Sequence, residues 1–270
     1  MSARLVTPAR RLGGRAPLPL FFLIIPPLAS LLASTGCAGT DVGNPMTVSR
    51  LEGAAIVEAP ASPNALALPS VELDEVWLAV TDVGLGLEPA CAGGPKEDSP
   101  TAFELLSGAE LPQAPALEHG SRDVVCGVTV RLGPLSAPLP PEAPAALGES
   151  SLFVLGRRAD GVPLEVRARL HDTIKLVPVG GAGFTLDDPS TILAFAVDRW
   201  FAELDLGGAA LTDGVLRIDE THNAALLGAL RKAFRASARL LRDPDATGAP
   251  SAATAAAPLA VSEDSPGTPR

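Results

Sequence analysis

The residues whose chemistry is easiest to place are the three cysteines, Cys37, Cys91 and Cys126. Cys37 ends an apolar stretch, Cys91 lies in the Gly/Pro-rich segment EPACAGGPKEDSP, and Cys126 lies in the alternating segment DVVCGVTVRL. No His/Cys pair has the spacing of a zinc site. If Cys37 is used elsewhere, the other two form an even set that can pair in an oxidising compartment. We predict a Cys91–Cys126 disulfide closing a loop of about 36 residues, with two buried reduced thiols as the alternative.

A second candidate for chemistry lies near the C-terminus. The segment DPDATG carries oxygen-bearing side chains at its first, third and fifth positions, Asp243, Asp245 and Thr247, and a glycine at its sixth. This is how an EF-hand calcium loop begins, but position twelve, where a Glu ligand is needed, holds Thr254. We favour a polar turn that ends a helix and keep calcium as a weak candidate.

The three histidines lie outside any catalytic or metal motif. His119, His171 and His222 form no H-E-x-x-H pattern, and the chain contains neither a G-x-S-x-G elbow nor a phosphate-binding loop. On this basis we expect no enzymatic activity and no cofactor.

The N-terminal segment has the features of a secretory signal peptide. Residues 1–36 contain four arginines and no acidic residue, and residues 18–33 read LPLFFLIIPPLASLLA. A basic start, an apolar middle and small residues before a cleavage site are typical of such signals. A transmembrane anchor is the alternative, but a spanning helix needs about 20 apolar residues. In addition, Pro26 and Pro27 would kink a helix midway through this stretch.

The end of this segment, STGC at residues 34–37, resembles the cleavage site of bacterial lipoproteins, although Leu is commoner where Ser34 stands. The resemblance implies that the Cys37 thiol receives a diacylglycerol, that the chain is cut before it, and that the new amine is acylated. An ordinary signal-peptidase site leaving a free thiol is the alternative. By the sorting rule of enteric bacteria, Ala38 implies lipid anchoring at the outer membrane, on either its periplasmic or its surface face.

A second resemblance concerns residues 37–45, CAGTDVGNP. They are similar to the mature start of a group of uncharacterised lipoproteins from high-GC Gram-negative bacteria. A looser likeness extends to VELDEVWLAVTDVGL and FRASARLLRD. The group has no assigned activity, so the resemblance implies a location and not a reaction.

The charge balance excludes one class of partner. The chain has 31 acidic and 21 basic residues, and removal of residues 1–36 leaves a formal charge of about −14. Nucleic-acid binding needs clustered Lys and Arg, so we expect no nucleic-acid partner. The partners expected are the membrane, through the N-terminal lipid, and an unidentified envelope protein or glycan.

The elements that must position these residues are mainly strands. Period-two alternation or buried apolar runs predict strands at residues 74–87, 123–132, 151–170, 173–179 and 191–197. In residues 123–132 the apolar face includes Cys126, which we therefore expect to point inward. Residues 151–170 form a hairpin around the turn pair Asp160–Gly161.

Helical spacing appears near the C-terminus. Apolar side chains recur three or four residues apart through residues 223–243, and a basic face accompanies them. That face suits a solvated helix surface better than an anionic lipid surface. A short helix over 198–205 would place Trp200 and Phe201 in the core.

The fold class expected is mainly β: an antiparallel β-sandwich of roughly seven strands with a C-terminal α-helix. The expected organisation is a signal peptide over 1–36 and a flexible tether over 37–50. The sandwich with its helix would span 51–246, and a disordered tail 247–270.

For function we expect a lipid-anchored envelope protein that acts as a non-enzymatic structural or interaction module. The alternative is a lipoprotein that binds carbohydrate or a small ligand through loops at one end of the sandwich, and its sign would be Trp77 or Trp200 exposed in a cleft. A third reading, a hydrolase, would be favoured by facing carboxylates in a pocket or by a histidine beside an acid.

Overall fold

One mixed β-sheet organises the part of the chain that the structure describes. The structure is a computed structural model that describes residues 44–57, 68, 70–92, 94–107, 115–136, 139–266 and 268. The predicted signal peptide, residues 1–36, and Cys37 lie outside these residues.

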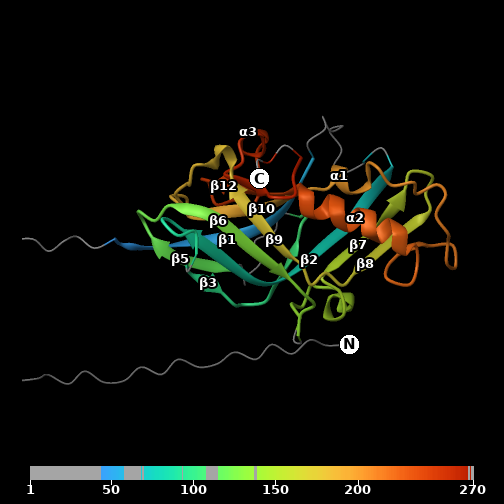
Figure 1. Ribbon diagram of the computed structural model, residues 1–270. Helices are drawn as coiled ribbons and strands as arrows, with labels where there is room; N and C mark the ends of the chain where they lie inside the picture. Colours follow the sequence, from blue (N-terminus) through green and yellow to red (C-terminus); the bar gives the residue numbers. More distant parts are fainter. Residues whose placement is uncertain are drawn as a thin grey trace, which may run out of the picture. The chain divides into compact units, whose positions relative to one another are not determined.

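Thirteen strands are present in the described residues, together with three α-helices and two 3-10 helices (Figure 1). The strands are β1 (Met46–Ile56), β2 (Val71–Leu87), β3 (Lys96–Glu97), β4 (Thr101–Glu104), β5 (Ala116–Gly120), β6 (Val125–Leu132), β7 (Leu152–Arg158), β8 (Pro163–Ala168), β9 (Thr173–Pro178), β10 (Ser190–Ala196), β11 (Leu216–Ile218), β12 (Ala238–Asp243) and β13 (Ala260–Ser262). The helices are α1 (Asp198–Phe201), α2 (Ala224–Ser237), α3 (Ala252–Ala256), η1 (Ala145–Gly148) and η2 (Val179–Gly181).

The prediction of a seven-strand antiparallel sandwich is wrong, although the mainly β class is confirmed. The strands form a single curled sheet in the order β11-β8-β7-β2-β6-β9-β13-β12-β10-β1-β5, with β3 and β4 also paired to β2. Two pairs are parallel, β1 with β10 and β8 with β11. In β1 the register joins Arg50 to Ser190, residues far apart in the chain. Periodicity is local and carries no information about such a partner.

The central strand and the hairpin follow the predicted pattern. In β2, Val76 and Leu78 enter the main core, while Trp77 and Ala79 face a second cluster on the other side of the sheet. Strands β7 and β8 pair as a hairpin around Gly161, whose φ is +85°. Glycine tolerates that left-handed conformation without steric cost, which explains why the turn could be located from sequence.

Strand β6 departs from simple alternation. Its register with β2 shifts between Gly86 and Leu87, and two residues separate the buried Val125 from the buried Val128. A β-bulge adds one residue to a strand and reverses which face the following side chains occupy. Cys126 is therefore half-buried and does not point into the core, contrary to the prediction.

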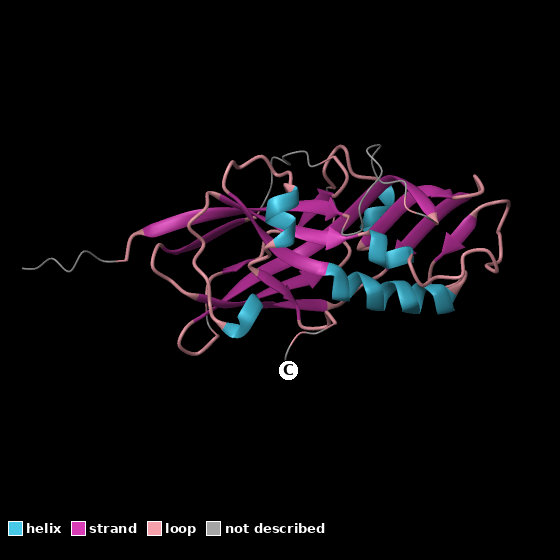
Figure 2. Cartoon of the chain, turned by 90° about the horizontal axis from the view of Figure 1, so that it is seen from above, coloured by secondary structure: helices cyan, strands magenta, loops and turns pink. Residues whose placement is uncertain are grey.

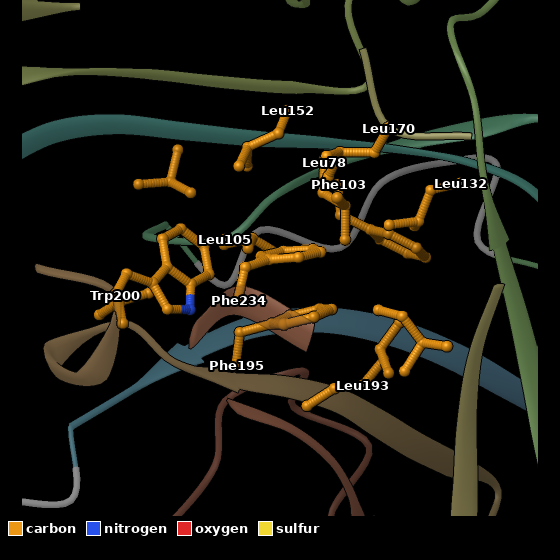
Figure 3. Close-up of a cluster of buried hydrophobic side chains, with 14 of the residues drawn as sticks. Leu78, Phe103, Leu105, Leu132, Leu152, Leu170, Leu193, Phe195, Trp200 and Phe234 are labelled. Carbon is orange, nitrogen blue, oxygen red and sulfur yellow. The ribbon is translucent and has the colours of Figure 1, made fainter. Parts of the chain in front are cut away.

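The C-terminal helix ends earlier than its apolar spacing suggests. Helix α2 stops at Ser237, and the chain continues at once as strand β12. The buried Trp200 indole N–H donates to the Ser237 hydroxyl (2.8 Å), which donates in turn to the Phe234 carbonyl (2.7 Å). Phe234 is stacked on Phe195 and lies edge-on to Trp200 (Figure 3). The ring centroids of Phe195 and Trp200 are 4.9 and 5.2 Å from that of Phe234. The expectation that Trp200 and Phe201 are core residues is confirmed.

Both predicted irregular ends contain regular structure. Met46–Arg50, placed in the tether, belongs to β1 and pairs with β5. The segment expected as a disordered tail contains α3 and β13, and β13 lies in the sheet between β9 and β12, with Ala260 fully buried. Strand β13 has three residues and β3 only two, which is too short for an alternation signal to be seen.

Candidate functional site

The predicted disulfide is present. Cys91 and Cys126 are bonded, with their Cα atoms 5.6 Å apart, and they join the segment after β2 to β6. The Cys91 backbone N–H donates to the Leu87 carbonyl (2.8 Å), which folds the segment back over β2. A Cβ at Gly86 would lie 2.9 Å from the Cys91 carbonyl oxygen, so the absence of a side chain there allows the close approach. Since the chain has three cysteines, Cys37 is the one outside this bond.

The DPDATG segment is a hydrogen-bonded turn at the end of β12. The buried Asp243 carboxylate accepts from the Ser190 hydroxyl (2.6 Å) and from the backbone N–H groups of Thr247 (3.1 Å) and Gly248 (2.9 Å). The side chains of Asp245 and Thr247 are exposed. This turn uses the Asp243 oxygens inside the fold, which favours the turn interpretation over calcium. The turn ends a strand, however, and not the helix we predicted.

The three histidines occupy different settings. His119, in β5, is buried, and its Nδ1 lies 3.1 Å from the Gly120 carbonyl oxygen. His171 is exposed beyond the end of β8. His222 lies beside an acid, with its Nδ1 2.9 Å from Asp219 Oδ2. Within the described ranges, no three His, Cys, Asp or Glu side chains converge as metal ligands would.

The Asp219–His222 pair is one of the signs proposed for a hydrolase, because a carboxylate can orient an imidazole that moves a proton. Here Asp219 also accepts from the backbone N–H groups of Thr221 and His222 and from the Thr221 hydroxyl, each at 2.7 Å. Partial burial raises the pKa of the Asp219 carboxyl, but the hydrogen bonds from Thr221 and His222 outweigh it and lower this pKa to about 2. These bonds give Asp219 a structural task, to hold the turn that leads into α2.

An acidic hollow has Trp77 in its lining. Its volume is about 370 Å³, and Trp77 is only 5 % exposed. The acidic side chains around it are Asp74, Glu75, Glu104 and Glu142. The Glu104 carboxylate accepts from the backbone N–H groups of Val76 (3.4 Å), Leu106 (3.2 Å) and Ser107 (2.5 Å). Like Asp219, Glu104 is thus used to hold backbone.

A groove of about 650 Å³ lies between α1, α2 and the chain after β13. We call it the α2 groove. Its apolar walls come from Trp200, Leu204, Ala229, Ala233, Ala236 and Pro266, and its charged rim from Arg199, Glu203, Lys232 and Asp264. The groove is open along α2 because the three alanines there have only small methyl side chains. A small amphipathic molecule could bind with its body on the alanines and its polar end at the rim.

Sequence reasoning missed this groove because one wall belongs to the segment interpreted as a disordered tail. The alanines recur three or four residues apart in the sequence, and this was the available signal. Exposure of Trp77 or Trp200 in a cleft is the sign expected for the carbohydrate-binding alternative, and the structure does not show it. Trp200 is fully buried and Trp77 nearly so, and neither is an exposed platform on which a sugar ring could stack.

Three basic residues of α2 and β12 pair with carboxylates of the same chain. Arg231 pairs with Glu220 (3.0 Å), Arg235 with Asp264 (2.8 Å), and Arg242 with Asp188 (3.1 Å). These pairs tie the helix and the following strand to loops and to the C-terminal segment. These three arginines of the basic run therefore have a structural use.

Comparisons with protein-family models, with curated proteins and with solved structures find no match to this chain. Within the part of the chain that the structure describes, no helix has the length and apolar character to cross a bilayer.

Proposed function

We propose that this chain is a lipid-anchored protein of the cell envelope, held at the outer membrane through Cys37, and that it acts as a non-enzymatic structural or interaction module. The observation that carries the proposal is the order of features in residues 1–37: a basic start, an apolar stretch and a cysteine preceded by small residues. Several acyl chains hold a protein on a membrane, because each buried methylene contributes about 0.8 kcal/mol.

The cysteine pairing supports this location. A disulfide between Cys91 and Cys126 fits an oxidising compartment outside the cytoplasm. It also leaves Cys37 as the remaining thiol for acylation. The absence of catalysis is proposed on different grounds, since Glu104 and Asp219 are occupied in holding backbone.

The experiment is the intact mass of the protein extracted from membranes, measured before and after reduction and alkylation. We expect the mass of residues 37–270 with a diacylglycerol and a third acyl chain, and two alkylated thiols only after reduction. The variant Cys37→Ala should be unacylated and leave the membrane fraction. A wild-type mass without acyl groups, or a Cys37→Ala protein that is still acylated, would overturn the anchor.

A second candidate function, binding of a small ligand, is favoured by the α2 groove. Because both tryptophans are buried, the ligand class that fits is amphipathic rather than a stacked sugar. The alanine wall offers apolar contact, and Lys232 at the rim is an exposed cation.

The groove can be tested with 8-anilinonaphthalene-1-sulfonate, an apolar fluorophore with one negative charge. We expect its emission to rise with the wild-type protein and not with Ala229→Phe, which fills the groove. Ala225→Phe, one turn earlier on α2 and outside the groove lining, is the matched control and should bind like wild type. No rise with wild type, or an equal loss in both variants, would refute the ligand site without bearing on Cys37.

A further inference from the structure

Exposed apolar side chains gather at the start of β1. Among the described residues, four large apolar side chains are strongly exposed, and two of them, Met46 (68 %) and Val48 (50 %), lie on this strand. The others are Val179 (52 %) and Leu211 (46 %). Met46 and Val48 are two residues apart, so they occupy the same face of the strand. Two such side chains side by side need an explanation that isolated ones do not.

The pairing of β1 explains why nothing in the described sheet covers them. Over Met46–Ser49, β1 is paired with β5, and its pairing with β10 begins only at Arg50. Met46 faces Gly120 across the pair, and glycine has no side chain to cover it, while Val48 faces Glu118, whose side chain is exposed. On the opposite face of the same segment, Thr47 is half-buried and Ser49 fully buried.

This end of the strand is held in place by hydrogen bonds to the turn between β5 and β6. Asn44 Nδ2 donates to Asp123 Oδ1 (2.8 Å), and Asn44 Oδ1 accepts from the Arg122 backbone N–H (2.9 Å). The Ser121 N–H donates to the Pro45 carbonyl (2.8 Å). The turn therefore keeps Arg122, whose side chain is exposed, close to Met46. We call Met46, Val48 and Arg122 the β1 patch.

The covalent distance to Cys37 restricts what can lie near this patch. Met46 is nine positions after Cys37, and an extended chain spans at most about 3.6 Å per position, so Met46 stays within roughly 32 Å of the anchor. Two apolar side chains bind a bilayer weakly by themselves. A short tether raises the effective concentration of the bilayer enough for a weak contact to be occupied.

We propose that the β1 patch contacts the phospholipid bilayer that carries the anchor, an inference that rests on the proposed acylation of Cys37. Met46 and Val48 enter the interface between headgroups and acyl chains, and the Arg122 guanidinium faces lipid phosphates. The contact would orient the sheet with the start of β1 toward the membrane. Arg122 offers local attraction to the phosphates, although Glu118 lies opposite Val48 and the full sequence has 31 acidic and 21 basic residues.

A single-cysteine label tests the contact in the acylated protein. Because Cys37 is acylated and Cys91 is bonded to Cys126, Val48→Cys introduces one free thiol for a bimane label. Val179→Cys is the matched control, since Val179 is equally exposed but lies in η2. Both proteins are placed in vesicles of phosphatidylethanolamine and phosphatidylglycerol that contain nitroxide-labelled lipid.

We expect the nitroxide lipid to quench the label at position 48 and to leave the label at position 179 unquenched. Adding Arg122→Gln should reduce the quenching at position 48. Acylated protein with equal quenching at both positions, or with none, would overturn the β1 patch and leave the anchor intact. Absence of acyl groups in the intact mass would overturn the anchor, and the patch with it.

Discussion

Removal of the Cys91–Cys126 disulfide should destabilise the protein through its unfolded state. The sequence separation is 35, and the loop-entropy relation for a loop of about 36 residues gives about 3.8 kcal/mol at 25 °C. Cavity formation should add little, because Cys91 is exposed and Cys126 half-buried. We therefore expect the double variant Cys91→Ser/Cys126→Ser to lose about 3–4 kcal/mol of unfolding free energy.

The assay is urea unfolding followed by tryptophan emission, since Trp77 and Trp200 are both buried and report loss of the core. Wild-type protein in reductant serves as the control and should match the double variant. Without the disulfide, the segment between positions 91 and 126 should gain conformational entropy only in the unfolded chain. A loss below about 1 kcal/mol with an unchanged denaturant slope would refute it, because the unfolded chain would then be restricted without the bond.

Three further predictions concern single positions. Asp243→Ala should lower the free energy of unfolding by about 2–3 kcal/mol, because three donors lose their acceptor. Millimolar Ca²⁺ should leave the melting temperature of wild type unchanged, and a calcium-dependent rise would contradict the turn assignment. Gly156→Ala would bring its Cβ into the Glu72 carbonyl and should lower the free energy of unfolding by about 3 kcal/mol. Gly161→Ala, in open space at φ +85°, should lower it by about 1–2 kcal/mol. Equal losses for the two variants in urea unfolding would contradict this. The pKa of Asp219 is lowered to about 2 from 3.8, so its stabilising contribution is complete above pH 4 and is lost as the pH falls through 2. The stability difference between wild type and Asp219→Asn should therefore narrow between pH 4 and pH 2, and a constant difference would count against the role of this carboxylate.

For the candidate sites, the number of cysteines and the spacing of residues in the sequence predicted only some of the contacts. Three cysteines and one anchor motif were enough to pair Cys91 with Cys126. The α2 groove was out of reach, because its walls come from α1, α2 and the segment after β13, which meet only when the sheet is complete. The task of Asp243 was also hidden, since one of its donors, Ser190, is distant in the chain.

The amino-acid sequence by itself determined the features that depend on neighbouring residues. The Asp160–Gly161 turn, the two-sided burial of β2 and the helical face of α2 follow from steric preference and periodicity over a few residues. Tertiary structure decided which strands pair, where α2 gives way to β12, and that Ala260 is buried in the sheet. The reason is that strand pairing and core closure are set by contacts between distant segments. Short segments such as β13 acquire their conformation only from the strands on either side.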